Sequence, residues 1–140
     1  MHLDLQKNGY SVAALRRMAQ KRLPRPIFDF IDGGAEDEDT LRQNECAFSD
    51  WELLPKPLNG AAKRDLKTSL FGHTLSSPLL IGPTGLAGLF WPQGEIAAAN
   101  AAKNYGTVYC LSHGSVCTLE QLASSHTGLK WMQVFIYKDR

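Results

Sequence analysis

The sequence has 140 residues, of which 44% are hydrophobic and 21% charged, a balance typical of an ordinary globular protein. The 15 Lys and Arg nearly match the 14 Asp and Glu, and the formal net charge is +1. The charges are scattered rather than gathered on one face, which argues against nucleic acid as a partner. The most apolar stretch is too short and too interrupted to span a bilayer, and the first residues lack the pattern of a secretory signal. We therefore expect a cytoplasmic protein.

The chain contains three cysteines, an odd number without a CxxC pair: Cys46, Cys110 and Cys117. This pattern favours reduced, buried thiols over a disulfide framework or a zinc site. We predict no metal site.

The first 50 residues predict three helices. Ser11 is a suitable N-cap for the first helix, and Pro24 should stop it. The second should end at Gly33 and Gly34, because glycine readily adopts the left-handed conformation that closes a helix. The third begins among acidic residues, which suit a helix N-terminus. The expected ranges are residues 10–23, 26–31 and 37–48.

After residue 51 the pattern changes, and DLKTSLFGHTLSSP (65–78) indicates a short hairpin. From residue 78 onward, apolar strands alternate with helices, which indicates a parallel sheet buried on both faces. The expected strands are 79–82, 107–112 and 130–137, and the expected helices are 94–106 and 115–126. We divide the chain into an N-terminal helical and hairpin cap, residues 1–77, and a strand-helix region, residues 78–140.

Two architectures use this alternation, the open doubly wound sheet and the closed eight-stranded barrel, and both bind ligands at the carboxyl ends of the strands. A dinucleotide site in an open sheet needs G-x-G-x-x-G running directly into a helix, then an acid after the second strand. Here Gly82, Gly85 and Gly88 are wrongly spaced, Pro92 delays the helix, and no acid follows the second strand until Glu120. The dinucleotide site is therefore the weaker alternative.

A barrel turn fits GPTG better. Pro83 fixes its own φ angle, and Gly85 lets a flat ligand approach the backbone closely. Such a turn offers peptide N–H groups to an electron-rich ring such as a flavin. Ser112 and Gln133 follow or lie on the next strands and carry suitable hydrogen-bonding groups. Each polar residue also has an ordinary structural explanation: Thr84 as a turn residue, Ser112 as a strand-end hydroxyl and Gln133 as a half-buried amide.

Four segments together are more specific. RLPRPIFDFIDGGAEDEDTLRQNECAF, LLIGPTGLAGLFWPQGE, TVYCLSHGSVCTLEQLAS and WMQVFIYKDR resemble the N-terminal part of the FMN-dependent 2-hydroxy-acid oxidases and dehydrogenases. The resemblance runs from about Ser11 over nearly the whole chain. The segments GPTGL and WPQGE are most similar to mandelate dehydrogenase.

The resemblance implies an α/β fold, N-terminal helices followed by the first three strands of a (β/α)8 TIM barrel that binds FMN. It implies oxidation of an L-2-hydroxy acid, mandelate- or lactate-like, with oxygen or a quinone as acceptor, in a homo-oligomer, a tetramer. Peripheral contact with a membrane is left open. By resemblance, the flavin contacts are Pro83, Thr84 and Gly85 near N5, Ser112 at the carbonyl edge and Gln133 at the pyrimidine edge.

The chain departs from the family at the substrate side. Phe30 and Phe135 stand where the family usually has tyrosines that contact the substrate, and Gly114 stands where some relatives have tryptophan. Losing a charge-assisted hydrogen bond costs about 1.5–3 kcal/mol, so small 2-hydroxy acids should bind more weakly, or the pocket should suit a larger apolar substrate. His113 is assigned no catalytic role, because the family's histidine base comes much later in the chain.

We expect no catalytic residue in this chain, because the family's base, arginines and phosphate loops belong to later strands. The chain should thus be the N-terminal part of a larger enzyme, inactive by itself. The alternative is a truncated, inactive fragment that acts as an interaction module.

Overall fold

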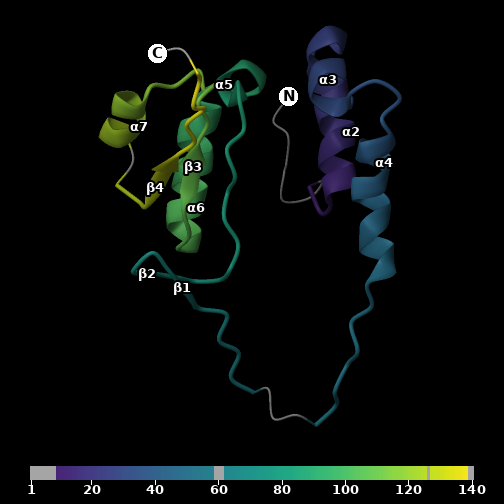
Figure 1. Cartoon of the computed structure of the whole chain (residues 1–140), viewed down its shortest axis with the longest axis vertical. Coiled ribbons are helices and arrows are strands. Elements are labelled where there is room, and N and C mark those ends of the chain that lie inside the picture. Colours follow the sequence, from purple (N-terminus) through teal and green to yellow (C-terminus); the bar gives the residue numbers. More distant parts are fainter. Residues whose placement is uncertain (1–8, 59–61, 126, 139–140) are drawn as a thin grey trace. The chain divides into compact units, whose positions relative to one another are not determined.

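The structure is a computed structural model that describes residues 9–58, 62–125 and 127–138 (Figure 1). The chain forms two compact units, residues 1–59 and residues 60–140. The expected boundary between cap and strand-helix region, at residue 77, stays a prediction.

The first unit is helical, as the sequence predicts. Its elements are α2 (Val12–Arg22), α3 (Arg25–Asp32), α4 (Asp39–Cys46) and the 3-10 helix η1 (Ala47–Asp50). The N-cap prediction is confirmed, because the Ser11 hydroxyl accepts a hydrogen bond from the Ala14 N–H at 3.1 Å. α2 ends at an extended Leu23, directly before Pro24.

The prediction that a glycine in the left-handed conformation closes α3 is wrong. Gly33 is extended, with φ −81° and ψ 155°. The glycines are needed here for space: a Cβ on Gly33 would lie 3.0 Å from the Asp29 carbonyl oxygen, and one on Gly34 would lie 3.1 Å from the Cβ of Leu41. The paired glycines therefore let the link between α3 and α4 pass close to both helices.

The second unit begins with the predicted hairpin. β1 (Thr68–Leu70) pairs antiparallel with β2 (His73–Leu75). The two turn residues are Phe71 and Gly72, with φ angles of 48° and 78°. The type I′ turn, whose twist matches that of the flanking strands, requires positive φ at both central residues.

The strand-helix alternation is also confirmed, but the strands are shorter than predicted. β3 (Tyr109–Leu111) pairs parallel with β4 (Lys130–Met132), and the first predicted strand is reduced to a parallel bridge at Ile81. Ile81 donates to the Val108 carbonyl at 3.1 Å and accepts from the Cys110 N–H at 3.0 Å. β4 was expected to continue to residue 137. It stops at Met132, since among the described residues no strand lies along its other edge to continue the ladder.

Helices connect these strands. α6 (Gly94–Tyr105) starts after Pro92 as predicted and ends at a left-handed Gly106, while a short helix, α5 (Ala87–Phe90), was not predicted. α7 (Leu119–Ser125) starts four residues later than predicted. Its start is fixed by a reciprocal cap, in which Thr118 Oγ1 accepts from the Gln121 N–H and Gln121 Oε1 accepts from the Thr118 N–H.

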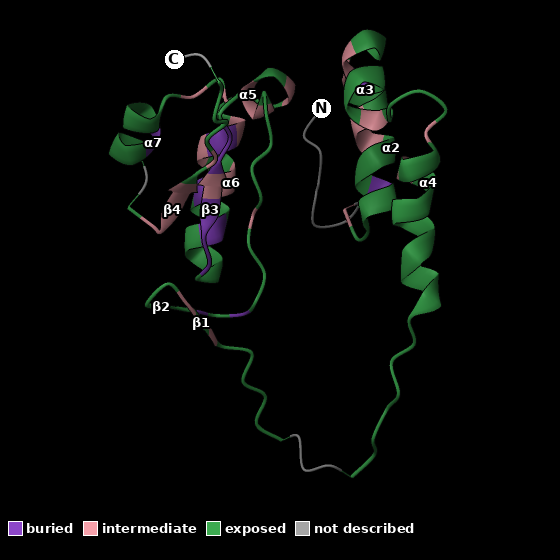
Figure 2. Ribbon diagram, in the orientation of Figure 1, coloured by how far each residue is buried: buried purple, intermediate pink, exposed green. Residues whose placement is uncertain are grey.

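The hydrophobic core of the second unit lies between α6, α7 and β3. Figure 2 shows the buried residues along β3 and α6. The cluster consists of Ala99, Ala102, Tyr109, Leu111 and Leu122. In the described residues the parallel strands form an open sheet and not a closed barrel.

The three thiols are free, and the prediction that they are buried is wrong for Cys46. Cys46 is exposed at the end of α4, and the other two are half-buried. Across the described ranges no group of three or more His, Cys, Asp or Glu is placed to hold a metal ion. Within those same ranges no helix has the length and apolar character to cross a membrane.

Candidate functional site

The ends of β3 and β4 bring two predicted site residues into contact. Ser112 follows β3 directly and Gln133 follows β4 directly, so both lie at the carboxyl edge of the parallel sheet. The Ser112 hydroxyl donates to Gln133 Oε1 at 3.2 Å, and the His113 N–H donates to the same oxygen at 3.3 Å. Ser112 is only 5% exposed and Gln133 is half-buried, so this hydrogen bond is partly shielded from water.

The glycine turn after Ile81 contacts the same edge. The Leu86 N–H donates to the Gly114 carbonyl at 3.0 Å, and the Gly114 N–H donates to Ser112 Oγ at 3.2 Å. A Cβ on Gly85 would lie 3.6 Å from the Gly114 oxygen and 3.8 Å from Ser112 Oγ, which is ordinary contact. The structure thus places Gly85, Ser112, Gly114 and Gln133 together.

Several hydrogen-bond donors are free at this edge. Among the described residues, the N–H groups of Thr84 and Gly85 have no hydrogen-bond partner, and neither has the amide nitrogen of Gln133. Pro83 and Thr84 are exposed. Gln133 Oε1 already accepts two hydrogen bonds, so the amide offers donors rather than both a donor and an acceptor. This donor set fits the electron-rich edge of a flavin ring.

An aromatic group extends from the same edge. The rings of His113 and Phe135 meet edge to face with centroids 5.5 Å apart. The centroid of the Tyr137 ring lies 6.2 Å from that of His113. Phe135 is 51% exposed. Phe30 belongs to α3 in the first unit and is 67% exposed.

Glu95 is a buried acid that the sequence analysis did not single out. It lies in the first turn of α6 and is 1% exposed. Its Oε1 accepts from the Val116 N–H at 3.1 Å. One signal in the sequence points to it: Glu95, Ala99 and Ala102 are spaced as one face of a helix, and that face is the buried one.

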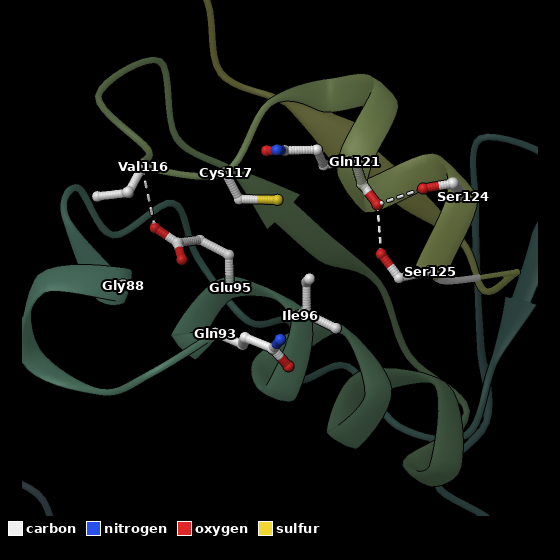
Figure 3. Close-up of a pocket in the computed structure, with 9 residues that line it drawn as sticks. All are labelled: Gly88, Gln93, Glu95, Ile96, Val116, Cys117, Gln121, Ser124 and Ser125. Carbon is white, nitrogen blue, oxygen red and sulfur yellow. Dashed lines mark hydrogen bonds between the residues drawn. The ribbon is translucent and has the colours of Figure 1, made fainter.

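A pocket of about 440 Å³ opens beside Glu95, and Figure 3 shows its lining. Polar side chains from the start of α6 and from α7 contribute, among them Gln121 and Ser124. Burial, with a smaller contribution from the charge of Glu95, raises the pKa of Tyr109 to about 12. The same two causes raise the pKa of the Cys117 thiol, so this cysteine is neutral at pH 7 and a poor nucleophile.

Parallel strands joined by helices, with free donors at their carboxyl edge, define an α/β protein. A family model described as FMN-dependent dehydrogenase matches residues 19–140. The chain therefore belongs to the FMN-dependent dehydrogenase family.

The relatives show how much of such a protein is present. (S)-mandelate dehydrogenase of Pseudomonas putida is 39% identical over 94% of this chain and 34% of its own length. L-lactate dehydrogenase of Pseudomonas syringae pv. syringae is 40% identical over 93% of this chain and 34% of its own length. A solved structure of (S)-mandelate dehydrogenase, described as a monotopic membrane protein, matches with a TM-score of 0.87 and 40% identity, covering 93% of this chain and 35% of that one. The chain spans about a third of the length of these relatives and matches their N-terminal third.

Proposed function

We propose that this chain is part of an FMN-dependent enzyme that oxidises an L-2-hydroxy acid, mandelate- or lactate-like, to the 2-oxo acid. The observation that most supports the proposal is the meeting of the glycine turn, Ser112 and Gln133 at the carboxyl edge of one parallel sheet. Family membership supplies the class of cofactor and of reaction. Bound FMN would accept the hydride equivalent that leaves the α-carbon of the substrate.

The residues of this chain would bind and orient the flavin. The unpaired N–H groups of Thr84 and Gly85, next to Pro83, would donate to the ring edge near N5. The Gln133 amide nitrogen would donate to the pyrimidine edge, held in place because its oxygen is fixed by the hydroxyl of Ser112. A ligand that needs the Ser112 hydroxyl for itself must compete with Gln133.

The substrate side of the proposed pocket is apolar. Phe135 presents a ring without a hydroxyl, Gly114 leaves space beside it, and Phe30 is proposed to contribute from the first unit. Such a lining favours an aromatic or otherwise large side chain on the 2-hydroxy acid over lactate. The proposal includes a cytoplasmic location with peripheral membrane contact and a tetrameric assembly, with oxygen or a quinone as acceptor.

Flavin binding is tested in the complete enzyme by titrating FMN and following the quenching of flavin fluorescence. Gln133→Leu should raise the dissociation constant about tenfold, because one buried hydrogen bond to the ring is lost. The matched control is Gln20→Leu, an exposed glutamine on α2, which should leave the dissociation constant unchanged. Equal affinities for the two variants would remove the flavin role of Gln133, and no FMN binding by the complete enzyme would refute the proposal.

The substrate side is tested in the complete enzyme by steady-state kinetics. Phe30→Tyr combined with Phe135→Tyr should lower KM for a small 2-hydroxy acid, because each new hydroxyl can bind the substrate's polar groups. Kinetics that do not change would remove both residues from the substrate site.

A second candidate is an inactive interaction module. One observation favours it: the residues after β4 are apolar and exposed, with Val134 at 63% and Ile136 at 95%. Such a segment readily pairs with another polypeptide. An absorption spectrum combined with the mass of the purified species separates the candidates. Flavin bands in a species heavier than this chain support the enzyme, whereas a colourless chain in complex with a partner supports the module.

A further inference from the structure

Glu95 is a buried carboxylate that the proposed flavin contacts do not use. It is 1% exposed, and none of the ion pairs among the described residues includes it. Glutamate is rarely buried to this extent without a cationic partner, because losing hydration is costly for a charged group. Its surroundings must therefore provide hydrogen-bond donors in place of water.

A helix N-terminus and one backbone donor favour the carboxylate at this position. Glu95 lies in the first turn of the 12-residue helix α6, where the helix dipole favours a negative charge. Its Oε1 accepts from the Val116 N–H, in the loop that follows β3 (Figure 3). Its Oε2 faces α5, since a Cβ on Gly88 would lie only 3.0 Å from that oxygen. The carboxylate thus fills the space between α5 and the loop.

That loop, residues 112–116, carries the candidate flavin contacts. At its middle, the backbone of the glycine turn holds it through the hydrogen bond from the Leu86 N–H to the Gly114 carbonyl. At its end, the described hydrogen bond that anchors the backbone N–H of Val116 is the one to Glu95. Within the loop, the Ser115 N–H donates to the Ser112 carbonyl at 3.2 Å and closes a tight turn. Movement at Val116 would therefore be passed on to Ser112.

We propose that Glu95 is a positioning residue, whose buried carboxylate fixes the loop 112–116 against α5 and so sets where Ser112 and Gly114 meet the flavin. The role of the loop toward flavin rests on the proposed function. The inference that Glu95 fixes the loop does not rest on the proposed function, because it follows from contacts within the second unit. The two parts are measured separately.

The hold on the loop is measured by amide hydrogen exchange. Glu95→Ala should speed exchange of the Val116 and Gly114 N–H groups about tenfold, since a hydrogen bond to a charged group is lost. Glu95→Gln keeps an acceptor oxygen in place and should restore most of the protection. The matched control is Glu120→Ala, an exposed acid in the first turn of α7, which should leave both amides unchanged. Unchanged exchange in Glu95→Ala would overturn the proposal.

The effect on the cofactor is measured by FMN titration and by the visible circular dichroism of the bound flavin. Glu95→Ala should raise the dissociation constant about tenfold and change the dichroism, and Glu95→Gln should recover both. Faster loop exchange with unaltered flavin affinity and dichroism would overturn the positioning role. If the complete enzyme without these substitutions binds no FMN, the proposed function fails, while exchange at Val116 still decides whether Glu95 holds the loop.

A second variant covers the case in which Glu95→Ala does not fold. Gly88→Ala adds a methyl group 3.0 Å from Glu95 Oε2 and 3.2 Å from the Val116 Cβ, so it pushes on the same contact from the other side. Alanine is otherwise favourable in α5, because glycine lowers helix stability. Faster exchange at Val116 in this variant supports the proposal, and unchanged exchange contradicts it.

Discussion

Replacing Ser112 by alanine tests the hydrogen bonds that join the strand ends. The hydroxyl donates to Gln133 Oε1 and accepts from the Gly114 N–H, both at 3.2 Å, and the residue is 5% exposed. Each buried hydrogen bond contributes about 0.5–1.5 kcal/mol net to the free energy of unfolding. Because two are lost and no volume is added, Ser112→Ala should lower that free energy by about 1–3 kcal/mol.

The assay is urea denaturation followed by tryptophan fluorescence and circular dichroism. The matched control is Ser124→Ala, whose hydroxyl donates to the Gln121 carbonyl at 2.9 Å on the exposed surface of α7. The control should change the free energy of unfolding by less than about 0.5 kcal/mol, because water replaces the lost bond and alanine favours the helix. If Ser112→Ala is no more destabilising than the control, the strand-end hydrogen bonds do not stabilise this fold, and the reasoning is refuted.

Three further predictions concern stability. Gly106→Ala should lower the free energy of unfolding by about 1–2 kcal/mol in urea denaturation, because φ is +80° and the new Cβ would collide with the Ser76 hydroxyl; wild-type stability would contradict this. Burial raises the pKa of Tyr109 to about 12, so the contribution of Tyr109 to the free energy of unfolding should be constant below pH 10 and fall by up to about 3 kcal/mol between pH 10 and 12, where the unfolded state ionises first. Tyr109→Phe should flatten this alkaline decline, and an equally steep decline would count against it. The hydrogen bond from Arg16 lowers the pKa of Asp32. The ionised Asp32 therefore stabilises the fold above about pH 4, and this contribution is lost as the pH falls. Asp32→Asn should make the loss of stability at acid pH less steep.

Much of the local structure could be predicted because it depends on neighbouring residues in the chain. Ser11 and Pro24 set the limits of α2 through their own hydrogen-bonding groups and geometry. The pair Phe71 and Gly72 fixes the hairpin turn. The alternation of strands and helices also predicted that Ser112 would lie at a strand end, since polar residues followed an apolar run there.

Other features depend on what lies beside each residue in space. Glu95 has the sequence signature of an ordinary helix N-terminus, and only packing against Gly88 and Val116 makes it a buried carboxylate. Gly33 has the signature of a helix C-cap, yet its extended backbone serves the close approach of neighbouring atoms.

The sequence by itself determined the α/β alternation, the edge at which polar residues gather and, through four segments, the family. The tertiary structure decided how long each strand is, since a strand persists only where a neighbour completes its hydrogen bonds. It also decided which donors stay free: Gln133 Oε1 is occupied by Ser112 and His113, which leaves its amide nitrogen and the N–H groups of the glycine turn. Those pairings depend on three-dimensional proximity between residues 20 and 21 positions apart, which local patterns do not encode.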